Sequence, residues 1–245
     1  MKSKIILLTI FATSLCVQCS SKGDFKTDTF KTKSGELKIT FLGHGTLMMQ
    51  FNDKIIHIDP VSAYADYSKL PKADLVLVTH EHSDHFEVKT IELISKDDTQ
   101  TVISQKCQKD FPKGIVMKNG DTKNFSDIKI EAVPAYNIVH MRDTGNPYHP
   151  KGEGNGYVIT FDDLKVYAAG DTENVPEMKN LKNIDIAFLP MNLPYTMTPE
   201  MVFDAAKMFN PKILYPYHFG ETDTSIIVNL LKDYKGVETR IRDLK

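Results

Sequence analysis

The 245-residue sequence contains only three cysteines, and two of them lie within the first 19 residues. Cys107 is therefore the single thiol of the remaining chain, which excludes a disulfide bond within that part. Cys107 follows a strand-like stretch and has no recognisable motif around it. We interpret it as a packing residue and look for the chemistry of the protein in other residue types.

An excess of positive charge is also missing, because 30 lysines and arginines stand against 32 aspartates and glutamates, for a formal net charge of −2. Proteins that bind nucleic acid need a basic surface to neutralise phosphates. No run of lysine or arginine interleaved with aromatic residues occurs anywhere in the sequence. We therefore expect no nucleic-acid partner.

The sequence has no apolar run of transmembrane length, since the main apolar segment, residues 5–17, is too short to span a membrane as a helix. Lys2 and Lys4 precede it, which is typical of an export signal. Cys19 resembles the lipidation site of a bacterial lipoprotein, although Gln18 is bulky for that position. Two forms remain open: a soluble periplasmic protein, or a membrane-anchored lipoprotein that contacts the membrane only through its lipid.

Composition divides the chain into three parts. We expect a signal peptide at 1–19, a flexible linker rich in Lys, Thr, Ser and Gly at 20–36, and one folded domain at 37–245. A segment of that last length can bury one sizeable core.

Short strand-like runs at 37–42, 46–51 and 54–58 are separated by glycines and by an Asn-Asp turn, which predicts an antiparallel meander. The continuous apolar run at 75–78 predicts a strand that is buried on both faces. Further strands are predicted at 128–133, 157–161, 165–169, 184–189 and 212–217.

Two helices are predicted in the second half. The first has Thr198 as its N-cap and Pro199 at its first position, and it stops before Pro211. The second places the apolar residues of 226–234 on one face, Ile226 included, and stops at Gly236. Strand-rich halves that each finish in helices indicate an α/β (α+β) protein, a four-layer αββα sandwich with two sheets face to face.

Three imidazoles and a carboxylate crowd into residues 80–85, His-Glu-His-Ser-Asp-His, directly after the predicted strand at 75–78. Neutral imidazole nitrogen and carboxylate oxygen are the preferred ligands of zinc and similar divalent ions. In an extended segment His80 and His82 point to one side. Asp84 and His85 can then turn toward a second ion about 3.5 to 4 Å away, as in two-metal sites.

This run resembles the His-x-His-x-Asp-His signature of the metallo-β-lactamase superfamily. Segments 43–46 (Gly-His-Gly-Thr), 58–60 (Ile-Asp-Pro), 169–172 (Ala-Gly-Asp-Thr) and 217–220 (Tyr-His-Phe-Gly) agree with that family in order. The resemblance covers roughly residues 37–220. It implies that 37–245 is a catalytic domain of the metallo-β-lactamase fold and that the protein is a metal-dependent hydrolase.

The resemblance also implies a ligand set for two divalent metal ions, zinc in the first place and manganese as the alternative. In this set His80 and His82 bind the first ion, Asp84, His85 and His218 bind the second, and Asp171 bridges both. Asp59 would support the ligands by hydrogen bonding. We leave His44 and His57 out of the set and interpret His57 as a packed strand residue.

One family ligand does not carry over, because Asn137 stands where the family usually has a further histidine for the first ion. We favour His149 as its replacement, since imidazole is a better zinc ligand than an amide and the loop around His149 is rich in Gly and Pro. Asn137 itself and His140 remain open as alternatives.

The two ions of such a site activate a water as hydroxide, which suits cleavage of an ester, lactone or phosphoester of a small molecule. We expect Asp84 and Asp171 to be catalytic: Asp84, or a water that it positions, would pass a proton to the leaving group, and Asp171 would hold both ions. Tyr136, Tyr148, Tyr195 and Lys151 are candidates for stabilising an oxyanion.

The family's common zinc β-lactamases place a cysteine where Asp171 falls, so antibiotic cleavage is disfavoured. Its di-iron members usually carry glutamate at the position of His82, which favours hydrolysis over redox chemistry here. The departure at Asn137 keeps one alternative open: an exported, non-catalytic metal-binding module that retains the hydrolase fold.

Overall fold

The computed structural model describes residues 25–245. The expected signal peptide at 1–19 and the start of the expected linker at 20–24 lie outside the described residues. Within residues 25–245, no helix combines the length and the apolar character needed to cross a membrane.

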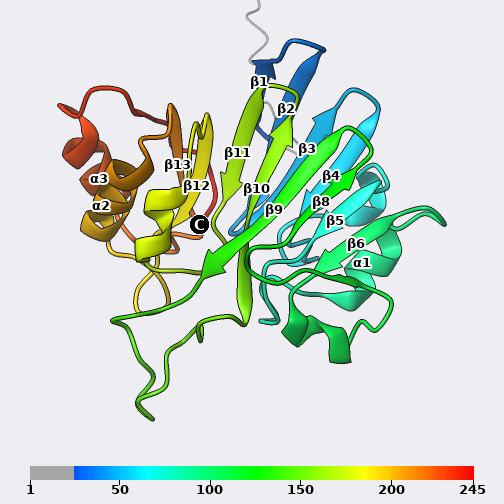
Figure 1. The fold of residues 1–245 in the computed structure, drawn as a ribbon, viewed down its shortest axis with the longest axis horizontal. Coiled ribbons are helices and arrows are strands. Elements are labelled where there is room, and N and C mark those ends of the chain that lie inside the picture. The colour runs from blue at the N-terminus through cyan, green and yellow to red at the C-terminus, as the bar shows by residue number, and fades with distance from the viewer. Residues whose placement is uncertain (1–24) are drawn as a thin grey trace, which may run out of the picture.

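Two seven-stranded sheets pack face to face, with helices on their outer sides (Figure 1). The first sheet consists of β1 (Thr27–Lys31), β2 (Glu36–Gly43), β3 (Thr46–Phe51), β4 (Lys54–Ile58), β5 (Leu75–Leu77), β6 (Gln100–Ile103) and β7 (Ile115–Val116), in that order. The second consists of β14 (Glu238–Thr239), β13 (Ile213–Tyr217), β12 (Ile186–Pro190), β11 (Leu164–Ala168), β10 (Gly154–Phe161), β9 (Ile128–Ala135) and β8 (Thr122–Phe125). The predicted αββα sandwich is confirmed.

The helices are α1 (Val88–Ile94), α2 (Pro199–Phe209) and α3 (Thr224–Leu231), with short 3₁₀ turns η1 (Tyr67–Lys69), η2 (Gln105–Lys109) and η3 (Pro176–Asn180). As predicted, the Thr198 hydroxyl accepts the Met201 N–H at the start of α2, and left-handed Asn210 ends it. On α3 the buried stripe consists of Ile227 and Leu231, one turn apart. Ile226 is 40% exposed, so its predicted place on the buried face is wrong.

Strand direction explains where the polar motifs meet. In the first sheet β4, β5 and β6 run parallel, and in the second sheet β11, β12 and β13 run parallel. Parallel strands bring their carboxyl ends to one edge of a sheet, where ligands usually bind. The segments that follow β4, β5, β11 and β13 carry Asp59, the 80–85 motif, Asp171 and His218.

The apolar run at 75–78 is buried on both faces, as predicted. Leu75 and Leu77 belong to the core between the sheets, whereas Val76 and Val78 pack in a second cluster with α1. Cys107 lies in this second cluster and is fully buried, and burial raises the pKa of its thiol to about 12. These contacts support a packing role.

Strand β1 lies inside the range 20–36 that we expected to be a flexible linker, so this expectation is wrong for residues 27–31. The strand pairs antiparallel with β2, with Phe30 opposite Leu37, and Phe30 packs against the core. Asp28 receives bonds from Arg242 and Tyr215. The sheet begins before residue 37 because one apolar residue and one half-buried ion pair hold an otherwise polar edge strand.

Candidate metal centre

Asp59, at the end of β4, fixes the start of the histidine motif. Its carboxylate accepts the Thr79 N–H at 2.8 Å and the Thr79 hydroxyl at 2.7 Å, and it lies 2.8 Å from Nδ1 of His85. All three residues are buried. Because Nδ1 of His85 donates to Asp59, its Nε2 is the nitrogen left to face the centre. This is the supporting contact expected of Asp59.

Two glycines allow the close approach of the segments around the centre. A Cβ atom on Gly45 would lie 2.7 Å from Cε1 of His85, so a side chain there would displace that imidazole. Gly170 has φ +64°, and a Cβ on it would lie 2.8 Å from the carbonyl oxygen of Asn155. Only glycine satisfies both the conformation and the space at Gly170.

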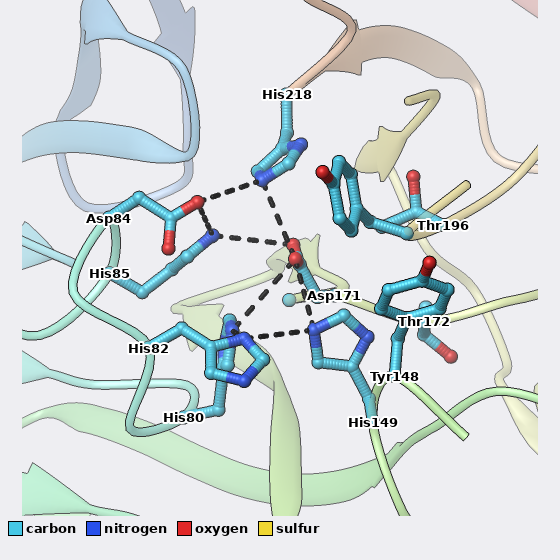
Figure 2. A network of polar contacts seen from close by, with 12 residues as sticks. His80, His82, Asp84, His85, Tyr148, His149, Asp171, Thr172, Thr196 and His218 are labelled. Atoms are coloured by element: carbon cyan, nitrogen blue, oxygen red, sulfur yellow. Dashed lines mark hydrogen bonds and ion pairs between the residues drawn. The ribbon is translucent and has the colours of Figure 1, made fainter. Parts of the chain in front are cut away.

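His80, His82 and His149 form a first group of imidazoles (Figure 2). Nδ1 of His82 lies 3.1 Å from Nε2 of His80 and 3.2 Å from Nε2 of His149. His149 comes from the connection between β9 and β10, far along the chain from the other two. This connection supplies the third nitrogen where the family's usual histidine is absent.

A second group consists of His44, Asp84, His85 and His218, whose ligand atoms all lie within 4.8 Å of one another. Oδ2 of Asp84 is 3.2 Å from Nε2 of His44, 3.6 Å from that of His218 and 3.8 Å from that of His85. We left His44 out of the predicted set, yet the structure places it here. The signal in the sequence was its place between two glycines in segment 43–46, and in the structure its backbone is left-handed, with φ 53°.

Asp171 lies between the two groups, as Figure 2 shows. Its Oδ2 is 3.3 Å from Nε2 of His149 and 3.4 Å from Nε2 of His218, and its Oδ1 is 3.4 Å from Nε2 of His85. Oδ2 also lies 3.8 Å from Nε2 of His80. One buried carboxylate thus contacts imidazoles of both groups, which is the position predicted for a bridging ligand.

Burial and the neighbouring charges set the protonation states of the centre. Burial alone would raise the pKa of Asp171, but the imidazoles of His218 and His85 hold it well below its usual range. Burial and the charge of His85 lower the pKa of His80 well below its usual range. Burial opposes charge on His85, yet the carboxylates of Asp171 and Asp59 raise its pKa to about 9. A cation would replace this proton.

Unpaired atoms test whether the residues fit a metal. Nε2 of His85, Oδ1 of Asp171 and Nε2 of His218 are buried and make no hydrogen bond within residues 25–245. A buried polar atom without a partner costs about 1–3 kcal/mol. These atoms all face the same centre, and nitrogen and oxygen donors of this kind match a divalent cation. The donor set therefore fits.

The three alternatives for the missing ligand are separated by geometry. Oδ1 of Asn137 accepts from Nδ1 of His149 at 2.7 Å and from its N–H at 2.9 Å. Nδ2 of Asn137 donates to Glu173 at 3.1 Å and to the carbonyl of Tyr195 at 2.9 Å. Nδ1 of His140 lies 2.7 Å from Glu173, outside the two groups. His149 joins the first group, and Asn137 orients its ring.

Sequence reasoning missed Glu173, two residues after the predicted bridge. Its buried carboxylate accepts the backbone N–H groups of residues 138–140, each at 2.7 Å, in addition to the amide of Asn137. Burial alone would raise the pKa of Glu173, but these bonds lower it. The ionised side chain anchors the segment that carries the amide partner of His149.

A hollow of about 290 Å³ opens onto the centre. Asp84 reaches it with a side chain that is 43% exposed, and Tyr195 lies at its wall. The hydroxyl of Tyr136 and Nζ of Lys151 instead bind Glu177, so these two candidates for oxyanion stabilisation do not line the hollow. The remaining lining residues are His44, His82, Ser83, Arg142, His149, Asp171, Asn192 and His218.

Comparison with known proteins identifies the family. A family model described as a beta-lactamase superfamily domain matches residues 38–218. The chain therefore belongs to the metallo-β-lactamase superfamily, as the motif predicted.

Two relatives carry the description UPF0173 metal-dependent hydrolase. That of Koribacter versatilis is 34% identical over 200 residues, covering 75% of this chain and 84% of the relative. That of Pelotomaculum thermopropionicum is 30% identical over 195 residues, covering 75% and 85%. These similarities place the chain among metal-dependent hydrolases, which confirms the predicted enzyme class.

Solved structures extend the likeness. A crystal structure from Parabacteroides distasonis, classed as a metal-dependent hydrolase, is 54% identical, with a TM-score of 0.87, covering 91% of this chain and all of that one. Igni18, a metallo hydrolase from Ignicoccus hospitalis, is 24% identical with a TM-score of 0.71 over 85% of this chain and 95% of its own. The latter supports the fold alone.

Proposed function

We propose that the protein cleaves an ester, lactone or phosphoester of a small molecule at a site that holds two divalent ions, zinc in the first place. The observation that carries this proposal is the position of Asp171, whose two oxygens contact imidazoles from both ligand groups. A single shared carboxylate between two sets of donors is the arrangement that a two-metal site needs.

In this proposal His80, His82 and His149 hold one ion, and Asp84, His85 and His218 hold the other, with Asp171 shared. The bound ions would polarise the attacked group and lower the pKa of a shared water toward neutrality. Asp59 keeps Nε2 of His85 directed at the centre, and Asn137 does the same for His149.

Asp84 is the residue that we assign to proton transfer toward the leaving group. Burial alone would raise its pKa, but the neighbouring imidazoles of His218 and His44 lower it, so the carboxylate is ionised, which is the state that accepts a proton. Its exposure to the hollow puts it within reach of substrate. His44 would hold this carboxylate in place through its contact at 3.2 Å.

Metal analysis combined with a substrate screen tests the proposal. Protein reconstituted with zinc or with manganese is measured for bound ions per chain and for cleavage of lactones, simple esters and phosphodiesters. We expect two ions and activity toward at least one of these classes, and loss of that activity after chelation. If two ions bind but no class of substrate is cleaved, the better description is a non-catalytic metal-binding module that retains the hydrolase fold.

Replacing His82 with alanine should abolish hydrolysis and lower bound metal to one ion or less, because the first group would keep too few nitrogen donors. Elemental analysis of the purified variant measures the loss. His140→Ala is the matched control, since His140 lies outside both groups and should leave two ions bound. Full activity of His82→Ala with both ions retained would contradict the assignment.

We propose export on the basis of the N-terminal sequence, which lies outside the described residues. The mature protein should begin at or after Cys19, with membrane association if that cysteine carries a lipid and a soluble periplasmic form if it does not. Mass spectrometry of the mature N-terminus in the native host separates the two forms. An intact Met1 would exclude both.

A further inference from the structure

Two segments that reach the lining of the hollow, the first through Arg142 and the second through Tyr195, carry exposed apolar side chains. Residues 25–245 expose eight large apolar side chains, and five of these belong to two short segments, 138–141 and 193–195. Val139 is the most exposed, at 66%. Apolar surface that stays exposed next to a pocket is a feature of ligand-binding grooves. The five residues, named the apolar rim from here on, are Ile138, Val139, Met141, Leu193 and Tyr195.

The apolar rim is held in place by buried polar contacts. Glu173 binds three consecutive backbone N–H groups of its first segment, and the amide of Asn137 donates to the carbonyl of Tyr195 in its second. The rings of Tyr148 and Tyr195 meet edge to face at 5.1 Å. The connection that carries the first segment projects from the fold in Figure 1 (green). A preformed rim loses little conformational entropy when it binds a ligand.

A cation lines the hollow directly after the first segment of the apolar rim in the chain. Arg142 is the one permanently charged cation among the residues that line the hollow. Its guanidinium lies 4.8 Å from the centroid of the Tyr148 ring, and it donates to the Tyr148 carbonyl at 3.3 Å. Among the described residues no carboxylate pairs with it, whereas Arg240 and Arg242 both pair with Asp28. Arg142 thus has bonding capacity left for an anion.

We propose that the substrate is an anionic amphiphile, with an acyl or alkyl chain along the apolar rim and a carboxylate or phosphate group facing Arg142. This inference rests on the proposed function only for the place where the scissile bond lies. The apolar rim contributes a hydrophobic attraction that increases with the length of the acyl or alkyl chain, and the guanidinium selects the charged group.

Binding rather than turnover tests the proposal, so that it can be separated from the proposed hydrolysis. Calorimetry on the metal-loaded full chain compares octanoate with butanoate and with neutral octanamide. A methylene that is about half buried should strengthen binding roughly 2-fold. We therefore expect octanoate to bind about 10-fold or more tightly than butanoate, and more tightly than octanamide.

Variants locate the two contacts. Val139→Ser combined with Leu193→Ser should lower the affinity for octanoate to near that for butanoate, while the affinity for butanoate stays unchanged. Arg142→Met should remove the preference for octanoate over octanamide. The matched control combines Leu93→Ser on α1 with Val228→Ser on α3, two exposed apolar residues away from the hollow, and should change neither ratio.

Equal affinities of the wild type for octanoate and butanoate would overturn the proposal. It would also be overturned if the control double variant lost as much octanoate affinity as the rim variant. Sedimentation with phosphatidylethanolamine and phosphatidylglycerol vesicles provides a further arm. If the double serine variant of the apolar rim binds vesicles less than wild type while its octanoate affinity is unchanged, the rim contacts lipid surfaces and the proposal is wrong. Octanoate binding without turnover of any ester would instead overturn the proposed function alone.

Discussion

Replacing Asp171 with alanine is expected to abolish hydrolysis and to reduce bound metal from two ions to one or none. The two oxygens of this carboxylate contact imidazoles of both ligand groups, so its removal takes a donor from each ion at once. The substitution also removes the negative charge that offsets the mutual repulsion of the surrounding imidazoles when they are protonated. Activity should fall by far more than the about 10–100-fold that follows removal of an outer hydrogen-bond partner. Elemental analysis beside a rate measurement gives the result.

The control for this experiment is Asp74→Ala, which removes a carboxylate that binds Lys96 and the N–H of Ile55 at the opposite end of the strands. That variant should retain both ions. Far-ultraviolet circular dichroism on both variants shows whether the fold survives. Loss of one ion with an unchanged rate in Asp171→Ala would mean that the carboxylate is not shared.

The parts of the centre that the sequence could predict are those encoded locally. The 80–85 motif places four side chains with metal-ligand chemistry directly after an apolar run. That run is a strand because Leu75 and Leu77 face one core while Val76 and Val78 face another. Asp171 and His218 follow strands of the same kind in the second sheet. The pattern of apolar residues and the residue types of metal ligands can both be recognised along the sequence. The apolar pattern also predicted the strands of the fold.

Contacts between distant segments could not be predicted in this way. His44 reaches the centre because the glycines beside it permit a left-handed turn and because its carbonyl accepts the N–H of His218, 3.1 Å away in space. Glu173 acts on a loop 33 to 35 residues earlier in the chain. Glu173 stands in no motif, and the segment 43–46 around His44 gave that histidine no ligand role, because a lone histidine or glutamate in a sequence is more often structural or solvated.

Polar composition misled the assignment of the N-terminal boundary for a related reason. Strand β1 alternates exposed and half-buried residues and is mostly polar, so its composition resembles that of a flexible linker. Its place in the sheet depends on backbone pairing with β2 and on Asp28, which meets Arg242 near the other end of the chain. An edge strand held by such contacts carries little hydrophobic signal of its own.

His149→Ala is the second substitution with a large expected effect, and it is paired with Asn137→Ala. Loss of His149 removes a nitrogen donor from the first group, so metal affinity should fall by more than the about 10–100-fold expected for an outer partner. Asn137→Ala should lower metal affinity by about 10–100-fold. Its Oδ1 accepts both the Nδ1–H and the backbone N–H of His149 but does not face the centre. Competition with a chromophoric chelator measures both affinities.

The double variant decides whether Asn137 acts through His149. If the amide only orients that imidazole, removing it from a chain that already lacks His149 should cost almost nothing further, and the two effects will be strongly non-additive. Additive losses would mean that Asn137 contributes to the centre independently. A larger loss from Asn137→Ala than from His149→Ala would make the amide oxygen the ligand, and such a site would suit a hard, oxygen-preferring ion such as manganese better than zinc. The bonds from Asn137 to Glu173 and to the Tyr195 carbonyl hold the amide with its oxygen toward His149, so we expect the non-additive result.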